Sequence, residues 1–325
     1  MKLSRRLRSG LVIPPGGVPA AYEHLKKFQA LAEEHGDRAA GTSGYEAAAR
    51  YVEHQLASAG YRSTRQYFTF KHRGEQIETF NILAETASGS DENVIMLGAH
   101  LDGVPGCPAI NDNGSGVAAV LEAAKALGRQ EGLSNRVRFA WWGAEEYKKE
   151  YGSRHYVKHL AKSDSAALDR IAAYLNFDMI ASPNPIIAVY DARDPKPHHD
   201  VPEGSRQIMD VFTDYFDTHD QPWVATDWDE DSDQLSFVKK GVAVGGLYTG
   251  DDQKKTTKQA RLFGGTAKRP CDPNYHRPGD DLSNVDLEAL SLMTDAITHA
   301  ATRLAHDHSA LKPARHRRTP PQGSG

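Results

Sequence analysis

The sequence is short of cysteine, of excess positive charge and of long apolar runs, and each shortage excludes a class of protein. Two cysteines in 325 residues are too few for a disulfide-stapled scaffold. The formal net charge of -4 gives no phosphate-binding surface, so we expect no nucleic-acid partner. No stretch approaches the roughly 18 apolar residues that a bilayer span requires, so we expect no membrane segment.

The two ends of the chain differ in composition from the part between them. Residues 1–19 carry three arginines but no apolar region of a secretory leader, which leaves two alternatives open: a protein that stays inside the cell, or a chain without its precursor segment. Residues 309–325 are basic and rich in Pro and Gly, which is typical of a disordered tail. Residues 20–308 show no internal repeat and no linker, so we predict a single domain.

Short apolar runs alternate with helical patterns along most of the domain. We predict a hairpin over 62–84 and buried strands over 94–99, 137–142, 172–180, 186–190 and 242–248. Helices are predicted over 20–35, 43–60, 114–129, 152–160, 205–216, 232–239 and 286–306, the second with a capping box of Ser43 and Glu46. This alternation predicts an α/β fold, with a mixed, largely parallel central sheet covered by helices on both faces.

Polar side chains gather where the predicted strands end. In open α/β sheets the carboxyl ends of the strands lie at one edge, where function concentrates. His100 and Asp102 follow the strand 94–99, and Asp112 lies in the turn that opens the next helix. Glu145 and Glu146 follow the strand 137–142, Asp178 lies near the end of 172–180, and Tyr275 and His276 lie in a loop before the last helix.

Imidazoles and carboxylates in this number form a ligand set suited to zinc, and acceptable to manganese or cobalt. Five ligands can hold two ions if one carboxylate bridges, and Asp112 on its tight turn is the natural bridge. His100 and Asp178 would complete one ion, and Glu146 and His276 the other.

Two further acids have roles beside the predicted ligands. Asp102 can accept the second ring N–H of His100, which would fix the orientation of that imidazole. Glu145 is adjacent to a ligand without being needed as one, so it can act as general base toward a metal-activated water. Each residue alone also has an ordinary explanation: a surface histidine, a solvated Glu-Glu pair, a helix-capping Asp178 or an Asn/Gly turn. Their joint placement at one sheet edge favours the metal site.

The motifs resemble, in order, those of the bacterial-type secreted dizinc aminopeptidases. The similar segments are Gly98–Asp102 as GAHLD, Asn111–Gly116 as NDNGSG, Trp142–Glu146 as WGAEE, Asn176–Ile180 as NFDMI, and Tyr275-His276. The similarity covers about residues 20–305. It implies the three-layer fold of zinc exopeptidases, two Zn²⁺ ions, and a peptide substrate with a free, large apolar N-terminal residue. We also expect a monomer, and secretion is the expectation for the family.

The resemblance implies the same site residues as the chemistry. The ligands would be His100, Asp112, Glu146, Asp178 and His276, the base Glu145, and Tyr275 would help to stabilise the transition state. Many relatives carry an inserted protease-associated domain after the first hairpin; the segment 70–93 is too short to hold one, so that domain is predicted to be absent.

Two positions depart from the family pattern near the substrate. Relatives commonly have Ser-Asp-His where this chain has Ser232-Asp233-Gln234, and in some of them an Arg that helps to hold the peptide's terminus stands where this chain has Asp231. The predicted metal ligands are intact, whereas these two positions, which bear on substrate recognition in the family, differ from its pattern. Only Asp295 matches the acids of a calcium site found in some relatives, so no calcium is predicted.

Three alternatives remain open from the sequence. A glutaminyl cyclase-like acyltransferase shares this fold and several ligands but works with one zinc. A non-catalytic member of the superfamily is disfavoured by the complete ligand set. Cys107 and Cys271 lie in loops that both lead to the predicted metal site, so they form either one disulfide, which would favour an oxidising compartment, or two free thiols.

Overall fold

The fold is built on one mixed sheet of eight strands, in the order β1-β2-β4-β3-β5-β8-β6-β7. The computed structural model describes residues 19–128, 130–194, 201–227, 232–307, 309 and 311. The predicted terminal segments 1–19 and 309–325 lie almost wholly outside these ranges, as does Asp231. The strands are β1 Thr64–His72, β2 Glu75–Glu85, β3 Ser90–His100, β4 Asn135–Trp142, β5 Ile171–Phe177, β6 Ala188–Tyr190, β7 Val224–Thr226 and β8 Ala243–Tyr248.

The centre of the sheet is parallel and its margins are mixed. β4, β3, β5 and β8 run parallel, with Leu97 beside both Phe139 and Leu175. The β1-β2 hairpin joins β4 antiparallel, and β6 joins β8 antiparallel. The prediction of a mixed sheet with a parallel core is therefore confirmed. Residues 70–93 are accounted for by the hairpin and the start of β3, which leaves no room for an inserted domain.

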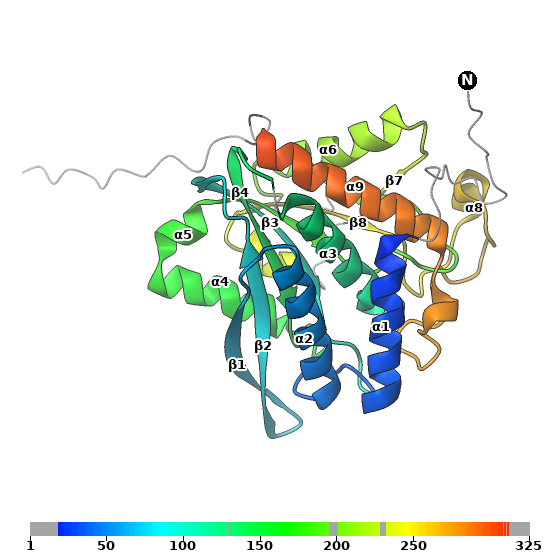
Figure 1. Ribbon diagram of the computed structural model, residues 1–325. Coiled ribbons are helices and arrows are strands. Elements are labelled where there is room, and N and C mark those ends of the chain that lie inside the picture. Colours follow the sequence, from blue (N-terminus) through cyan, green and yellow to red (C-terminus); the bar gives the residue numbers. More distant parts are fainter. Residues whose placement is uncertain are drawn as a thin grey trace, which may run out of the picture.

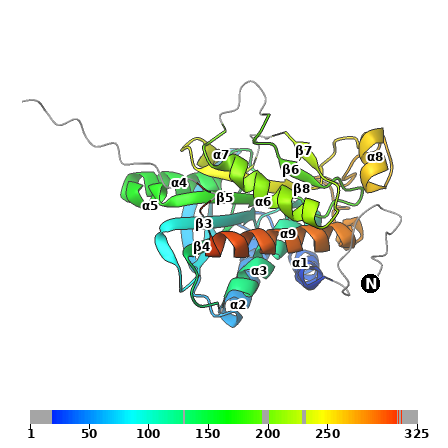
Figure 2. The same ribbon diagram turned by 90° about the horizontal axis from the view of Figure 1, so that it is seen from above.

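Helices cover both faces of the sheet, as predicted (Figures 1 and 2). One face is covered by α1 Ala20–His35, α2 Ser43–Ser58, α3 Gly116–Leu127, α6 Ser205–Thr218 and α9 Leu287–His306. The other is covered by α4 Tyr151–Ser163, α5 Ser165–Asp169 and α7 Gln234–Val238. The remaining elements are α8 Thr257–Phe263 and the short turns η1 Ile110–Ser115 and η2 Leu282–Asn284. No helix within the described ranges combines the length and apolarity needed to cross a bilayer.

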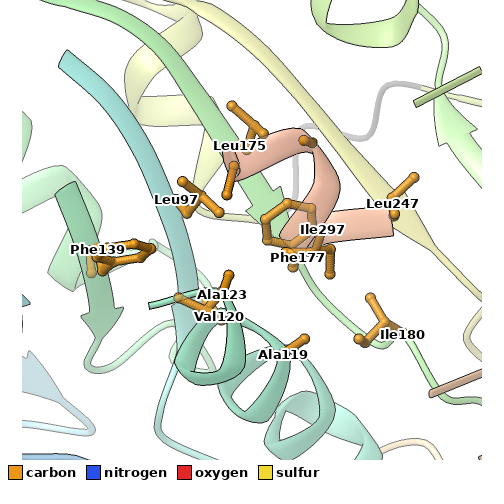
Figure 3. Packing of buried hydrophobic residues seen from close by; sticks show 14 of the residues in the cluster. Leu97, Ala119, Val120, Ala123, Phe139, Leu175, Phe177, Ile180, Leu247 and Ile297 are labelled. Atoms are coloured by element: carbon orange, nitrogen blue, oxygen red, sulfur yellow. The ribbon is translucent and has the colours of Figure 1, made fainter. Parts of the chain in front are cut away.

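Apolar rows on the sheet explain why the helices dock where they do. Small residues of α3, Ala119 and Ala123, let that helix approach Leu97 of β3 closely, as Figure 3 shows. Phe139 and Leu175 flank Leu97 on the same face, and all of these side chains are fully buried. Such close packing fixes the strands relative to one another, and therefore fixes the loops that follow them.

The opposite face is held by an aromatic stack. Tyr174 of β5 lies flat against Phe237 of α7, with ring centroids 3.9 Å apart. Its hydroxyl accepts the indole N–H of Trp142 at 2.8 Å and donates to the Asn176 side chain at 2.8 Å. These bonds satisfy polar groups that would otherwise be costly to bury.

Two local predictions were wrong in detail. The predicted strand 172–180 ends at Phe177, because Met179 takes a left-handed φ of 54° that no strand continues through. The predicted capping box of Ser43 and Glu46 does not form. Thr42 is the extended N-cap residue and its side chain accepts the N–H of Tyr45, while Glu46 pairs with Arg50 and Arg65.

The packing of Leu97 allows a test of the core. Leu97→Ala should lower the free energy of unfolding by about 2–5 kcal/mol, because it leaves a cavity in a close-packed layer. Leu287→Ala, at a residue that is 38% exposed, should cost less than about 1 kcal/mol. Urea unfolding followed by circular dichroism measures both, and equal losses for the two variants would contradict this account of the core.

Candidate metal centre

Five predicted ligands meet in two groups that share Asp112. His100, Asp112 and Asp178 form the first group, and Asp112, Glu146 and His276 the second. In the first group His100 Nε2 lies 3.2 Å from Asp178 Oδ1 and 3.3 Å from Asp112 Oδ1. In the second, His276 Nε2 lies 3.1 Å from Asp112 Oδ2 and 3.0 Å from Glu146 Oε2. Each oxygen of Asp112 therefore faces a different imidazole.

These separations fit a metal coordination sphere. Nitrogen and oxygen ligands held tetrahedrally at zinc distances lie roughly 3.3 Å from one another. The observed 3.0–3.3 Å separations match that value without rearrangement. In addition, Glu146 Oε1 is buried and has no hydrogen-bond partner. A buried carboxylate oxygen in that state is costly unless a cation approaches it, so this donor set fits a divalent metal such as zinc.

The turn around Asp112 is fixed by the two asparagines beside it. The Asn113 side chain donates to Phe177 O at 2.8 Å and accepts the N–H of Met179 at 3.3 Å, so it grips the chain on both sides of Asp178. The Asn111 side chain accepts the N–H of Ala181 at 3.1 Å. These bonds lock the two aspartates into one relative position, and they explain why the NDNG sequence does more than form a turn.

Asp280 supports the same turn from the opposite side. Its buried carboxylate accepts the backbone N–H groups of Asn111 at 2.8 Å and of Asp112 at 3.0 Å. Burial raises the pKa of Asp280 to about 7. Asp280 is not among the site residues predicted from the sequence. Its only sequence signal is its place four residues after His276, which a single sequence cannot distinguish from an ordinary loop acid.

Asp102 acts differently from the prediction. The Nδ1 of His100 lies 3.0 Å from the backbone carbonyl of Asp102, whereas the carboxylate is 3.9 Å away. Because a carbonyl only accepts, Nδ1 carries the hydrogen and Nε2 faces the cluster. The Asp102 carboxylate instead accepts the backbone N–H groups of Glu145 at 3.1 Å and Glu146 at 3.3 Å. It therefore holds the Glu-Glu pair in place.

Burial and the neighbouring charged groups shift the pKa values of the cluster residues. Burial raises the pKa of Glu146 to about 8, with the Asp112 carboxylate adding to the shift, and burial likewise raises the pKa of Glu145 well above its usual range. Burial alone would lower the pKa of His276, but hydrogen bonds to Asp112 and Glu146 raise it to about 10. Burial would also lower the pKa of His100, but the negative charges of Asp178 and Glu145 outweigh it and raise that pKa.

Glu145 and Tyr275 lie beside the two groups and belong to neither. Both line a hollow of about 830 Å³ together with Asp112, Glu146 and Asp178. The Tyr275 ring stacks on His276 with centroids 3.9 Å apart, and burial beside the acids raises the pKa of its hydroxyl. The hydroxyl therefore stays protonated and able to donate. The predicted catalytic pair thus opens onto the same space as the predicted ligands.

Ser232 is a second supporting residue that the sequence analysis did not single out. Its hydroxyl donates to Asp178 Oδ2 at 2.9 Å and accepts from the Asn176 side chain at 3.0 Å. Asn176 also donates to Gln234 Oε1 at 2.9 Å. Gln234, at the position where relatives commonly have His, therefore takes part in a neutral hydrogen bond with Asn176. The Asp178 carboxylate keeps one oxygen on Ser232 and the other facing His100.

Strained backbone concentrates at this edge of the sheet. Ala109, Ala144, Met179 and His276 have φ between 54° and 61°, although none is glycine. Such residues commonly mark functional sites, because the surrounding structure must hold them in place. The two cysteines, by contrast, are buried free thiols, so the disulfide alternative is not realised.

The fold is shared with enzymes of known structure. The zinc aminopeptidase BSAP of Bacillus subtilis superposes with a TM-score of 0.71 at 15% identity, over 92% of this chain and 98% of that one. Porphyromonas gingivalis glutaminyl cyclase superposes with a TM-score of 0.66 at 17% identity, over 87% of this chain and 96% of that one. At these identities the likeness establishes the fold, and the sequence must decide the family.

The chain belongs to peptidase family M28, whose model matches residues 81–301. The probable lipoprotein aminopeptidase LpqL of Mycobacterium tuberculosis is 47% identical over 70% of this chain and 46% of its own length. Leucine aminopeptidase 2 of Trichophyton rubrum is 44% identical over 71% of this chain and 46% of its own length. Leupeptin-inactivating enzyme 1 of Streptomyces exfoliatus is 39% identical over 89% of this chain and 61% of its own length. The chain spans about half the length of most of these relatives.

The raised pKa values predict that metal binding displaces protons. Because burial raises the pKa of Glu146 to about 8 and hydrogen bonds to Asp112 and Glu146 raise that of His276 to about 10, this pair holds at least one proton at neutral pH when no metal is bound. Ligands bind metal only when deprotonated, so zinc binding should release at least about one proton per chain and should tighten as pH rises from about 6 to 8.

Calorimetry of zinc binding in two buffers with different ionisation heats measures this release. Glu146→Gln, which has no carboxyl proton to lose, should release fewer protons than the wild type. An affinity that does not change with pH, with no proton released, would contradict the coupling.

Proposed function

We propose that this chain is a zinc-dependent aminopeptidase that hydrolyses the first peptide bond of substrates with a free N-terminus. The observation that supports it most directly is the pair of ligand groups sharing Asp112, with Glu145 beside them and outside both. Membership of peptidase family M28 supports the same activity. So do the names of the relatives, which include a probable lipoprotein aminopeptidase and a leucine aminopeptidase.

The proposal includes two zinc ions. His100 and Asp178 would hold one, Glu146 and His276 the other, and Asp112 would bridge them with one oxygen to each. The bound ions would polarise the substrate carbonyl and lower the pKa of an attacking water toward about 7. A monomer without nucleic-acid or membrane partners remains part of the prediction.

Glu145 is the proposed general base. Its carboxylate takes a proton from the attacking water and then delivers it to the nitrogen of the leaving amine. The hydrogen bonds from the Glu145 and Glu146 N–H groups to Asp102 keep this carboxylate beside the ligand groups. Burial raises the pKa of Glu145 well above its usual range, which makes its carboxylate a stronger proton acceptor.

Tyr275 is the proposed hydrogen-bond donor to the oxyanion. Its hydroxyl keeps its proton because burial and the surrounding acids raise its pKa. One such donor is typically worth about 3 kcal/mol in the transition state. Glu145 and Asp178 are the candidates for binding the free α-amine of the substrate, a contact that would restrict the enzyme to N-terminal residues.

The metal count separates this proposal from the glutaminyl cyclase alternative. Because both ligand groups are complete, protein purified with zinc should contain two zinc ions per chain, and a chelator should abolish hydrolysis of aminoacyl-p-nitroanilides until zinc is returned. Elemental analysis by mass spectrometry gives the count. One zinc per chain, with cyclisation of N-terminal glutamine, would favour the cyclase instead.

Replacement of Glu145 separates catalysis from metal binding. Glu145→Ala should lower kcat by about 100- to 10,000-fold, because a general base contributes about that factor, while zinc stoichiometry stays intact. Glu92→Gln, an exposed residue near the start of β3 at the other end of the strand, serves as control. A fully active Glu145→Ala enzyme would refute the role of base.

A further inference from the structure

A second hollow adjoins the metal centre on the side of Asp178. It is smaller than the first hollow, is partly open to solvent, and shares Asp178, Met179 and Tyr275 with it. Neither Glu146 nor His276 lines it. A substrate whose first carbonyl and α-amine lie at the metal centre must direct its first side chain into a neighbouring space, and this hollow begins at the candidate residue for the α-amine.

The walls of the second hollow are polar and acidic. Besides Asp178 they include the carboxylates of Asp227 and Asp251 and the hydroxyls of Tyr190 and Tyr248. Among the described residues that line it there is no lysine, arginine or histidine, and Met179 is the single aliphatic side chain. Gln234, which stands where relatives commonly have histidine, is also in the wall and brings no positive charge at any pH.

Asp251 is held in position at the end of the strand β8. The Asp251 Oδ1 atom accepts the backbone N–H of Gln253 at 2.8 Å, a hydrogen bond that fixes the carboxylate relative to the loop after the strand. The charge is therefore part of a fixed wall, in contrast to the next residue, Asp252, which is exposed and does not line the hollow.

We propose that this hollow selects a cationic first residue, lysine or arginine, in preference to the large apolar residue expected from the family. The inference rests on the proposed aminopeptidase function and specifies its substrate class. A leucine side chain would remove water from the half-buried carboxylate of Asp251 without replacing its hydrogen bonds, which is unfavourable. A lysine side chain can pack its methylenes on Met179 and the tyrosine rings and place its ammonium group beside the carboxylates.

The test compares substrates that differ in the charge alone. The values of kcat/KM for lysyl- and norleucyl-p-nitroanilide isolate the ammonium group, because norleucine has a similar length without the charge. Arginyl, leucyl and glutaminyl substrates complete the panel. We expect lysine to exceed norleucine by at least about tenfold, a factor typical of one charged contact.

Variants of the acidic residues then test whether their carboxylates cause the preference for lysine. Asp251→Asn keeps the shape and removes the charge, and should lower the lysine-to-norleucine ratio about tenfold. Asp227→Asn should lower it as well. Asp252→Asn, the neighbouring control, should leave the ratio unchanged, and thermal unfolding checks that each variant is folded.

The outcomes distinguish the inference from the function on which it rests. Norleucine or leucine cleaved as fast as lysine would overturn the cationic specificity and leave the aminopeptidase function standing. Glutamine cleaved faster than lysine would point to hydrogen bonding without charge and would also overturn it. A ratio unaffected by Asp251→Asn would overturn the role of that carboxylate. Failure to cleave any of the substrates with zinc present would overturn the proposed function and this inference together.

Discussion

The candidate site depends on the Asp112 carboxylate lying between two imidazoles. One oxygen faces His100 and the other His276, at 3.3 and 3.1 Å. The Asn113 side chain and the Asp280 carboxylate hold the turn that positions Asp112. Without cations this arrangement is unfavourable, since Glu145, Glu146 and Asp178 crowd the same space and burial raises the pKa of both glutamates. The unfavourable free energy of burying these acids together is confined to one edge of the sheet, as is common for functional sites.

The convergence of the ligands could be predicted because it follows from topology. His100 ends β3, and Glu145-Glu146 and Asp178 follow β4 and β5; the carboxyl ends of these parallel strands meet. The apolar runs identified those strands. Where the predictions were wrong, a local conformation decided the outcome: the left-handed Met179 ends β5 early and turns the chain just past Asp178.

The supporting residues could not be predicted because their roles depend on tertiary contacts. Asp280 reaches backbone N–H groups about 170 residues earlier in the chain, and Ser232 reaches Asp178 across 54 residues. The choice between the carbonyl and the carboxylate of Asp102 as partner of His100 depends on a difference of about an ångström, 3.0 against 3.9 Å. No pattern in a single sequence carries such information.

The two hollows differ in how closely the fold constrains them. The metal centre is built on strand ends that structures with only 15–17% identity retain. The acidic wall of the second hollow comes from residues after β7 and β8, where side chains can change without disturbing the sheet. Family membership therefore supports the proposed chemistry of the centre more strongly than it supports any one proposed first residue.

The central claim is that Asp112 bridges two ions, and anomalous diffraction at the zinc absorption edge from zinc-loaded crystals tests it most directly. The account predicts two anomalous peaks, one between His100 and Asp178 and one between Glu146 and His276, each contacted by a different oxygen of Asp112. A single peak, or two peaks of which only one contacts Asp112, would contradict it.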